Sequence, residues 1–373
     1  MKSEHEALVL ESGKFLVRSL PTPSPGPGDL LVAPLFVGVC GTDLDIARGS
    51  RVGGAAVLGH EGIAAVVAVG SEVMGFHEGQ YVVFNPVDPA SPRRVLGHSV
   101  DGLLQQRFLV RGADVSRGLV QSFKAHVPPV AAALAEPLAT VIYGQSLVRS
   151  IGDQNAVLVV GAGPVGVMHA TYARLTGTTE VLLVDPDTGR LQAAVRRGVI
   201  SPHEAVHDEK RLTSIVRERT GGRGVDALYL CTPRAGAVSA LRHALTALSS
   251  GGCIDLVVGF DDEARLPELR NARLNDFRWA NTCGKPTPGA VAQIARPNGS
   301  IVRLTGHRGT SARHLSKAMN HLERHQSMYS SVISHVSSLG DAPRVLSELL
   351  SSPGVSQVEG AICTKLIVNV QQP

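Results

Sequence analysis

The sequence has few aromatic residues, few cysteines and no long apolar run. Aromatic side chains make up only 4% of the 373 residues, so stacking platforms for nucleic-acid bases are not expected. The five cysteines are widely spaced and include no CxxC pair, which excludes a disulfide framework and a zinc ribbon and fits a reducing compartment. No segment reaches the ~18 apolar residues of a membrane helix, and the N-terminus lacks the apolar stretch of a signal peptide. We therefore expect a cytoplasmic protein that does not bind membranes.

Charge and composition indicate a globular protein of two domains. The 36 Lys and Arg exceed the 32 Asp and Glu by only four, and the basic residues are scattered, with Arg93 and Arg94 as the densest run. Because a nucleic-acid groove needs clustered basic residues, we expect no nucleic-acid partner. Hydrophobic residues make up 43% and charged residues 18%, and this length suits two domains that each bury a core.

The first third of the chain is predicted to be an irregular, largely antiparallel β region. The segment PTPSPGPG excludes a helix near its middle, because proline and glycine interrupt helices. Strand-like pieces, rich in β-branched and apolar residues, lie at 7–10, 14–18, 30–39, 63–69 and 80–84.

From about residue 155, short apolar strands alternate with helical segments. The strands are AVLVV, EVLLVD, VDALYLC, CIDLVVG and SIVRLTG. Strands separated by helices of about 10–15 residues indicate βαβ units and a parallel sheet. Residues 315–325 and 342–350 are predicted as amphipathic helices, and AICTKLIVNV as a closing strand.

A glycine motif follows the first of these strands and opens a helix. Its residues are Gly161, Gly163, Pro164, Val165 and Gly166, in GAGPVG. The first glycine makes a tight turn, the second lets the backbone approach a diphosphate, and the third allows helix and strand to pack closely. The helix N-terminus adds unpaired N–H groups, so the motif predicts a dinucleotide site.

Asp185 ends the next strand, where a carboxylate accepts hydrogen bonds from an adenosine ribose and repels a 2′-phosphate. This favours NAD over NADP, although Arg190 is near enough in sequence to allow some use of NADP. A lone glycine motif is often only a turn in an α/β protein, but strand, helix and acid together favour nucleotide binding.

Cys40 and His60 are the candidate zinc ligands. Cys40 follows an apolar strand in VGVCGTD, and His60 stands in GHE further along. A thiolate and an imidazole bind zinc well, and a catalytic zinc needs three protein ligands and one open position. Glu61 and Glu136, the latter at the start of an apolar helix, are the oxygen candidates. Considered one at a time, each residue also has a structural explanation: Cys40 suits a core, His60 suits a loop, and Glu136 suits a helix start, where the helix dipole stabilises it.

The other histidines carry no metal-ligand spacing that supports a role. We therefore interpret His98, His126, His169 and His307 as surface or packing residues.

These motifs together resemble the medium-chain dehydrogenase/reductase family, in particular its zinc-dependent branch of sorbitol, threonine and archaeal glucose dehydrogenase-like enzymes. The match runs over nearly the whole chain. It includes PxPxPGPGD, VGVCGTD, GHEGIAAVVAVG, the Asp101-Gly102 turn, AEPLA, VVGAGPVG, LVD and the terminal strand. The combination is more specific than any single motif.

The resemblance implies an α/β fold of two domains. A GroES-like, β-rich catalytic domain would cover residues 1–150 and 305–373, and a Rossmann domain with a doubly wound parallel sheet would cover 151–304.

The resemblance also implies roles for the candidate site residues. It places zinc ligands at Cys40 and His60, with Glu61 and Glu136 as positions that exchange with water or substrate. Thr42 falls where the family has a hydroxyl that relays the alcohol proton.

The chain departs from the family pattern in two places. The segment FNPVDPASPRRVLGHSVDG lacks the four closely spaced cysteines that hold a second, structural zinc in most zinc members. We therefore expect one catalytic zinc per chain and no structural zinc. Ala64 replaces a usual glycine, which the fold is expected to tolerate.

The implied activity is hydride transfer from a secondary alcohol to NAD. Zinc would polarise the substrate hydroxyl while Thr42 passes its proton toward solvent. Glu136 and a polar rim of Asp43, Asp45 and Arg48 favour a polyol, sugar, cyclitol or aminocyclitol over a long aliphatic alcohol. The alternatives are a zinc-free reductase of the same fold acting on enones or quinones, and a non-catalytic dinucleotide-binding protein.

The oligomeric state is predicted from an apolar edge strand. Residues 300–304 are expected at the edge of the Rossmann sheet, where pairing with a second copy would form a homodimer, or a homotetramer built from it. Residues 274–289, which include the only tryptophan, are expected to be a loop at the substrate entrance, at a subunit contact or in solvent.

Overall fold

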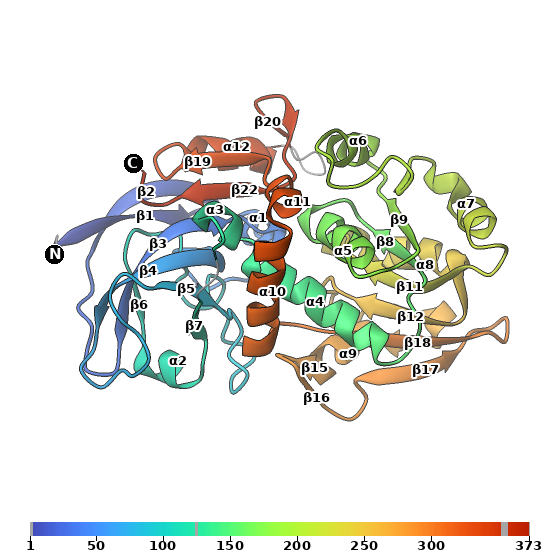
Figure 1. The fold of residues 1–373 in the computed structure, drawn as a ribbon, viewed down its shortest axis with the longest axis horizontal. Coiled ribbons are helices and arrows are strands. Elements are labelled where there is room, and N and C mark those ends of the chain that lie inside the picture. The colour runs from blue at the N-terminus through green and yellow to red at the C-terminus, as the bar shows by residue number, and fades with distance from the viewer. Residues whose placement is uncertain (1–2, 124–125, 352–356, 373) are drawn as a thin grey trace. The chain divides into compact units, whose positions relative to one another are not determined.

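The computed structural model describes residues 3–123, 126–351 and 357–372. The chain forms two units, of which unit 1 comprises Met1–Ala139 with Thr310–Pro373 and unit 2 comprises Thr140–Gly309 (Figure 1). The first division falls inside helix α4 (Ala135–Arg149), whereas the sequence placed it after residue 150. No helix among the described residues combines the length and the apolar character needed to cross a membrane.

Unit 1 is built on a mainly antiparallel sheet, as the sequence predicts for its first third. The strand order is β19-β22-β3-β4-β5-β7, with β6 also pairing with β3, and β19–β22 is its parallel pair. The bounds of its strands and helices are β1 Glu4–Glu11, β2 Lys14–Pro21, β3 Leu30–Gly38, α1 Gly41–Ala47, β4 Glu61–Val69, β5 Tyr81–Phe84, β6 Phe108–Val110, α2 Gly112–Ser116, β7 Val120–Ser122, α3 Pro129–Ala132, α10 Ala312–Arg324, α11 Gln326–Ser330, β19 His335–Ser338, α12 Ala342–Ser351, β20 Gln357–Val358, β21 Ala361–Ile362 and β22 Leu366–Asn369.

The pairing of β3 with β4 positions the candidate site. The two strands run antiparallel, and the last residue of β3, Gly38, pairs with the first residue of β4, Glu61. The chain leaves β3 just before Cys40 and enters β4 just after His60, so both residues lie at the same end of the sheet. Alternate residues of these strands, such as Leu30, Val32 and Val66, are buried in the unit 1 core, which fixes the register.

Unit 2 is a seven-stranded Rossmann-like sheet, which confirms the predicted α/β class. Its order is β10-β9-β8-β11-β12-β18-β17, and the direction of winding reverses at β8. Only β17 is antiparallel to its neighbour among the described strands of this sheet. The bounds are β8 Ala156–Val160, α5 Pro164–Leu175, β9 Glu180–Val184, α6 Thr188–Arg196, β10 Ala205–Val206, α7 Leu212–Arg219, β11 Val225–Leu230, α8 Ala237–Ala244, β12 Leu248–Leu256, β13 Arg265–Leu266, β14 Ala272–Arg273, α9 Leu274–Ala280, β15 Asn281–Thr282, β16 Lys285–Pro286, β17 Val291–Ala295 and β18 Ile301–Gly306.

Two sequence predictions about unit 2 are wrong. The strand expected at the edge, now β18, lies inside the sheet, because the short strand β17 pairs along its outer side from Val291↔Thr305 to Ala295↔Ile301. Residues 274–289 are not a plain loop. They form α9 and the hairpin β15–β16, and Leu274 and Phe277 of α9 are buried in the core. The dimer through residues 300–304 therefore loses its structural basis, and self-association stays a prediction.

Candidate active site

Three candidate ligands converge at the end of the unit 1 sheet. The ligand atoms of Cys40, His60 and Glu61 all lie within 4.8 Å of one another. His60 and Glu61 are buried, and Cys40 is partly buried at the N-cap of α1. His60 Nδ1 has no hydrogen-bond partner among the described residues. Sulfur, nitrogen and oxygen donors at this spacing form a ligand set that suits zinc.

Asp43 supports these ligands from the first turn of α1. Its carboxylate accepts a hydrogen bond from the Cys40 N–H at 2.8 Å and a longer one from the Gly59 N–H at 3.4 Å. The same carboxylate lies 3.8 Å from His60 Nδ1. Asp43 is fully buried, so the prediction that it belongs to an exposed polar rim is wrong. It orients both Cys40 and His60, as carboxylates around metal-binding histidines do.

Lys365, just before β22, completes the site from a distant part of the sequence. Its ammonium is 1% exposed, forms an ion pair with Glu61 and donates a hydrogen bond to the Val39 carbonyl at 2.9 Å. Gly38 leaves room for this pair, since a Cβ there would come within 2.7–2.9 Å of the Glu61 and Lys365 side chains. Burial alone would lower the pKa of Lys365, but the charges of Glu61 and Cys40 outweigh it and raise the pKa.

Burial controls the protonation of the acidic groups in this site. Burial, followed by the charges of Glu61 and Asp43, raises the pKa of the Cys40 thiol well above its usual range. Burial also raises the pKa of Asp43, and burial and the Glu61 charge raise that of Glu136 to about 8. Burial therefore favours the neutral, protonated forms of these three groups, while Glu61 is paired with Lys365. A bound divalent cation would instead stabilise the charged forms, including the thiolate that binds metal.

The remaining predicted residues of this site lie beside the three ligands. Thr42 is half-buried in α1, and its backbone N–H donates to the Cys40 sulfur. Glu136 lies in the first turn of α4 and is close enough for the charges of Glu61 and Lys365 to shift its pKa. It is not part of the close set formed by Cys40, His60 and Glu61.

His98 is a site residue that sequence reasoning missed. Its ring meets the His60 ring edge-on at 4.6 Å, and a second close set of potential metal ligands is Asp43, His60 and His98. His98 stands just before the Asp101-Gly102 turn, where Asp101 accepts hydrogen bonds from the N–H groups of Ala56 and Val57. Because His98 and His60 are far apart in the sequence, their spacing does not predict that the two rings meet.

The glycine motif in unit 2 has the geometry that its three positions predict. Gly161 has a φ of 107°, which favours glycine, and turns the chain at the end of β8. A Cβ on Gly166 would overlap the Gly161 carbonyl oxygen, so the third glycine allows α5 to pack against the loop. Gly163 is the N-cap of α5, and a Cβ on it would meet no atom within 4 Å. Pro164 and Val165 are partly exposed, which leaves the helix N-terminus accessible to an anion.

Asp185 is tied to this loop by hydrogen bonds. One carboxylate oxygen accepts from the Ala162 N–H at 2.7 Å and the other from the Asp187 N–H at 2.8 Å. Arg190 lies 3.9 Å from Asp185 and 3.6 Å from Asp187. Each carboxylate oxygen has two lone pairs, so Asp185 can still accept from a ribose hydroxyl. Arg190 lies between two acidic side chains. The 2′-phosphate of NADP would have to compete with both carboxylates to bind its guanidinium.

Thr232, which the sequence analysis did not single out, adds a polar group beside the glycine loop. A Cβ on Gly161 would lie 3.1 Å from the Thr232 nitrogen, which places Thr232 at the carboxyl ends of β8 and β11. Its hydroxyl oxygen is buried and has no hydrogen-bond partner among the described residues. Nucleotides bind at this point of reversal in open α/β sheets.

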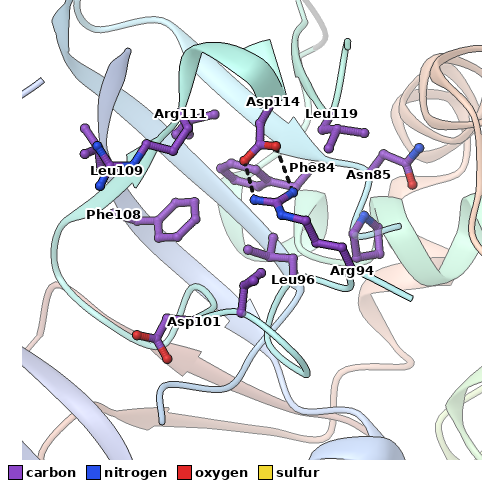
Figure 2. Close-up of a pocket in the computed structure, with 13 residues that line it drawn as sticks. Phe84, Asn85, Arg94, Leu96, Asp101, Phe108, Leu109, Arg111, Asp114 and Leu119 are labelled. Carbon is purple, nitrogen blue, oxygen red and sulfur yellow. Dashed lines mark hydrogen bonds and ion pairs between the residues drawn. The ribbon is translucent and has the colours of Figure 1, made fainter. Parts of the chain in front are cut away.

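A pocket of about 220 Å³ lies elsewhere in unit 1, and none of the candidate zinc ligands lines it. Figure 2 shows the Phe84 and Phe108 rings in its wall together with Arg94, which reaches Asp114. The arginine is paired with both Asp114 oxygens at 2.8 Å. The pocket therefore offers an apolar wall and a guanidinium that already has a partner.

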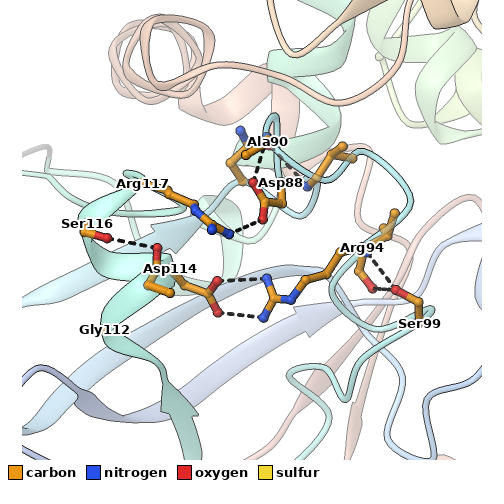
Figure 3. A network of polar contacts seen from close by, with 12 residues as sticks. Asp88, Ala90, Arg94, Ser99, Gly112, Asp114, Ser116 and Arg117 are labelled. Carbon is orange, nitrogen blue, oxygen red and sulfur yellow. Dashed lines mark hydrogen bonds and ion pairs between the residues drawn. The ribbon is translucent and has the colours of Figure 1, made fainter.

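Ion pairs hold the lobe that contains this pocket, residues 85–119. Besides Arg94 and Asp114, Arg117 pairs with the fully buried Asp88 at 2.6 Å (Figure 3). Asp88 also accepts from the Ala90 N–H at 2.9 Å. Bidentate arginine–carboxylate pairs give both attraction and fixed geometry. These contacts tie Asp88 and Arg94, in the segment that lacks clustered cysteines, to Asp114 and Arg117 at α2.

Comparisons with known proteins give sequence matches over most of the chain and fold matches over 99% of it. A family model described as the alcohol dehydrogenase GroES-like domain matches residues 26–118. The chain is 30% identical to sorbitol dehydrogenase of Rattus norvegicus over 342 residues, covering 82% of this chain and 90% of that protein. Among solved structures, 2R,3R-butanediol dehydrogenase from Bacillus subtilis superimposes with a TM-score of 0.75 at 18% identity, covering 99% of both chains. A zinc-binding dehydrogenase from Sinorhizobium meliloti 1021 bound to NADP does so with a TM-score of 0.72 at 23% identity, covering 99% of this chain and 100% of that one.

Proposed function

Because this chain belongs to the medium-chain zinc-dependent alcohol and polyol dehydrogenase family, we propose that it oxidises a secondary alcohol of a polyol, sugar, cyclitol or aminocyclitol and transfers the hydride to NAD. Members of this family are NAD(P)-dependent dehydrogenases that act on CH–OH groups. The observation that carries the proposal is the close set of Cys40, His60 and Glu61, whose sulfur, nitrogen and oxygen donors lie within 4.8 Å of one another.

Cys40 and His60 would hold the zinc, with Glu61 or Glu136 at the exchangeable position. Zinc bound there supplies Lewis-acid polarisation of the substrate hydroxyl, and NAD supplies the hydride acceptor. Asp43 orients Cys40 and His60 through its hydrogen bond and close approach. Lys365 holds Glu61 and limits its movement. The Thr42 hydroxyl, beside Cys40, is the group that would carry the alcohol proton toward solvent.

The choice of a polyol rests on the relatives and on Glu136 rather than on a polar rim. Sorbitol dehydrogenase of Rattus norvegicus is similar over most of this chain. Of the predicted rim, Asp43 is buried beneath the ligands, and Arg48 donates a hydrogen bond to the Leu349 carbonyl at 2.6 Å. Glu136 keeps a carboxyl group near the ligands that can meet a second substrate hydroxyl.

We further propose one zinc per chain. The ion pairs of Arg94 with Asp114 and of Arg117 with Asp88 support the 85–119 lobe without cysteine ligands. Among the residues that the structure describes, the two close sets of potential metal ligands share His60 and so form one site.

The test combines metal content with turnover. Elemental analysis of the purified protein should give about one zinc per chain, and a panel of polyols, sugars and aminocyclitols should reveal an alcohol that reduces NAD. The Cys40→Ser variant should lose the zinc, while Cys363→Ser, a buried cysteine outside the set, should keep it. Two tightly held zincs would refute the single-site proposal. A metal-free protein that reduces enones or quinones would establish the rival reductase function instead.

A further inference from the structure

The unit 2 sheet has one apolar face and one face with a polar row. Alternate residues of β11, β12 and β18 point to opposite faces, and Leu228, Ile254 and Leu304 lie in the apolar core with α7, α8 and α9. On the other face, Tyr229 of β11 pairs with Asp255 of β12, which pairs in turn with Thr305 of β18. All three are fully buried.

Asp255 forms a buried ion pair with His307, the residue directly after β18. His307 Nδ1 lies 3.1 Å from Asp255 Oδ1, and both side chains are completely buried. An ionised carboxylate only accepts hydrogen bonds, so pairing with Asp255 in that form requires the imidazole proton on Nδ1. Asp255 Oδ2 and His307 Nε2 have no hydrogen-bond partner among the described residues.

Helices α4 and α5 lie over one face of the unit 2 sheet (Figure 1), and Gly144 of α4 and His169 of α5 contact the polar row on that face. A Cβ on Gly144 would overlap Asp255 Oδ2 and come within 2.7 Å of His307 Cε1, so the glycine lets α4 approach the pair directly. The Tyr143 ring contacts the His307 ring at 4.9 Å, and the His169 ring contacts the Tyr229 ring at 4.6 Å. The pair is therefore enclosed on all sides by packed side chains.

Fold stability does not explain this arrangement. A buried ion pair often contributes less than apolar residues of the same volume, because both charges lose their hydration. The opposite face of the same strands uses leucine and isoleucine. A local departure from an apolar core is expected where function constrains the residues.

The location of the Asp255–His307 pair indicates its role. Asp255 is the penultimate residue of β12, and His307 directly follows β18, so both lie at the carboxyl ends of these strands. In a doubly wound sheet, ligands bind outside the carboxyl ends, and each half of the sheet receives one mononucleotide. The glycine loop after β8 takes the diphosphate, which leaves β11, β12 and β18 for the nicotinamide half.

We propose that Asp255 and His307 are positioning residues for the nicotinamide half of the dinucleotide. Their ion pair joins the carboxyl ends of β12 and β18 and fixes the backbone segments that follow, starting at Val257 and Arg308. Neither side chain touches the cofactor, since both are buried. This inference rests on the proposed function, because it requires that unit 2 binds NAD.

The test uses substitutions that alter the pair by one property at a time. Asp255→Asn keeps the shape but removes the charge, and its amide can turn the histidine to the other tautomer. His307→Leu removes the donor, whereas His307→Asn keeps an N–H donor near Asp255. We expect Asp255→Asn and His307→Leu to weaken NADH binding by roughly tenfold, the effect of losing about one hydrogen bond to the cofactor, with His307→Asn recovering most of it. The KM for NAD should rise while the KM for the alcohol and the zinc content stay unchanged.

Glu204→Gln is the matched control. Glu204 pairs with Arg174 at 2.6 Å, is 5% exposed and lies before β10 at the other edge of the same sheet. This variant should lower the melting temperature without changing NADH affinity. If Asp255→Asn also lowers only the melting temperature, the pair is structural and the positioning role is refuted. If the unaltered protein binds no NADH, the proposed function has failed before the variants are compared.

Discussion

The two candidate sites are built in opposite ways. In unit 1, side chains from three distant segments meet: Cys40 after β3, His60 with Glu61 at β4, and Lys365 before β22. In unit 2, the candidate cofactor site consists mainly of backbone atoms in the loop Gly161–Gly166. A site made of side chains is sensitive to the loss of a ligand atom. A site made of backbone is sensitive to an added atom.

This difference predicts that the two sites can be disabled separately. The largest effect is expected from Cys40→Ser or His60→Ala, which remove a proposed zinc ligand and should therefore lose Lewis-acid stabilisation of several kcal/mol, roughly a thousandfold in kcat/KM. NADH binding to unit 2 should stay within about twofold, because neither residue belongs to that unit. Alcohol oxidation assays and NADH fluorescence titration measure the two quantities side by side.

Cys363→Ser serves as the control for the cysteine variant, since Cys363 is buried in unit 1 outside the ligand set. It should retain both activity and zinc. Full turnover by a zinc-free His60→Ala protein would contradict the assignment of the unit 1 site.

The sequence predicted the parts of each site that depend on local spacing. The glycine motif, its flanking strand and helix, and Asp185 all lie within one βαβ unit, so their pattern is visible in a short window. Cys40 and His60 were found as residue types, and the resemblance supplied their roles.

The supporting residues could not be predicted in the same way. Lys365 is 304 positions from Glu61, and a single lysine before a strand carries no signal of burial. His98 reaches His60 only because the lobe folds back on the sheet. The short strand β17 was missed because VAQIA alternates weakly and is followed by a turn, and this error placed β18 at the sheet edge.

The second prediction sharpens the backbone side of the comparison. Gly166→Ala adds a Cβ that overlaps the Gly161 carbonyl oxygen, so the helix must shift, at a cost of about 1–3 kcal/mol in unfolding free energy. Gly163→Ala meets open space and should leave stability nearly unchanged. The added Cβ would still displace a cofactor diphosphate that lies close to Gly163. We therefore expect NADH binding to weaken by about 1.4 kcal/mol, or tenfold.

Urea unfolding and NADH titration of both variants distinguish the two roles. Gly163→Ala protein that binds NADH as tightly as the unaltered chain would show that the diphosphate does not approach this glycine.

The third prediction concerns cofactor choice. Asp185→Ser removes the charge that repels a 2′-phosphate and frees Arg190 from one of its two acids, so the ratio of kcat/KM for NADP over NAD should rise by about tenfold. The unaltered enzyme should prefer NAD. Asp185 also accepts from the Ala162 N–H, so the variant should bind both cofactors somewhat less tightly. Arg190→Ala, which should not improve the use of NADP, is the matched control. An unaltered enzyme that uses NADP better than NAD would overturn the role of Asp185.

The last prediction concerns stability rather than activity and involves His169, on the polar face of unit 2. Burial lowers the pKa of His169 to about 3, an effect that the Asp255 charge opposes and that His307 reinforces. The pKa of an unfolded histidine is about 6.5, so the unfolded state binds the extra proton first as the pH falls. Stability linked to His169 is therefore present above about pH 6.5 and is lost as the pH falls toward 3.

From pH 7 to pH 4 this linkage corresponds to about 3 kcal/mol of unfolding free energy, at 1.36 kcal/mol for each pH unit below the unfolded pKa. His169→Leu removes the titrating group, so its unfolding free energy should fall less over this range, as measured by urea titrations at both pH values. Burial lowers the pKa of His321 to about 4, so this residue also reduces the stability of the protein as the pH falls. Because His321 is present in both proteins, the difference between them isolates the effect of His169. The exposed His77→Gln should behave like the unaltered chain. Equal losses in the unaltered protein and His169→Leu would mean that His169 is not held neutral in the fold. The polar face would then contribute no acid sensitivity through this residue.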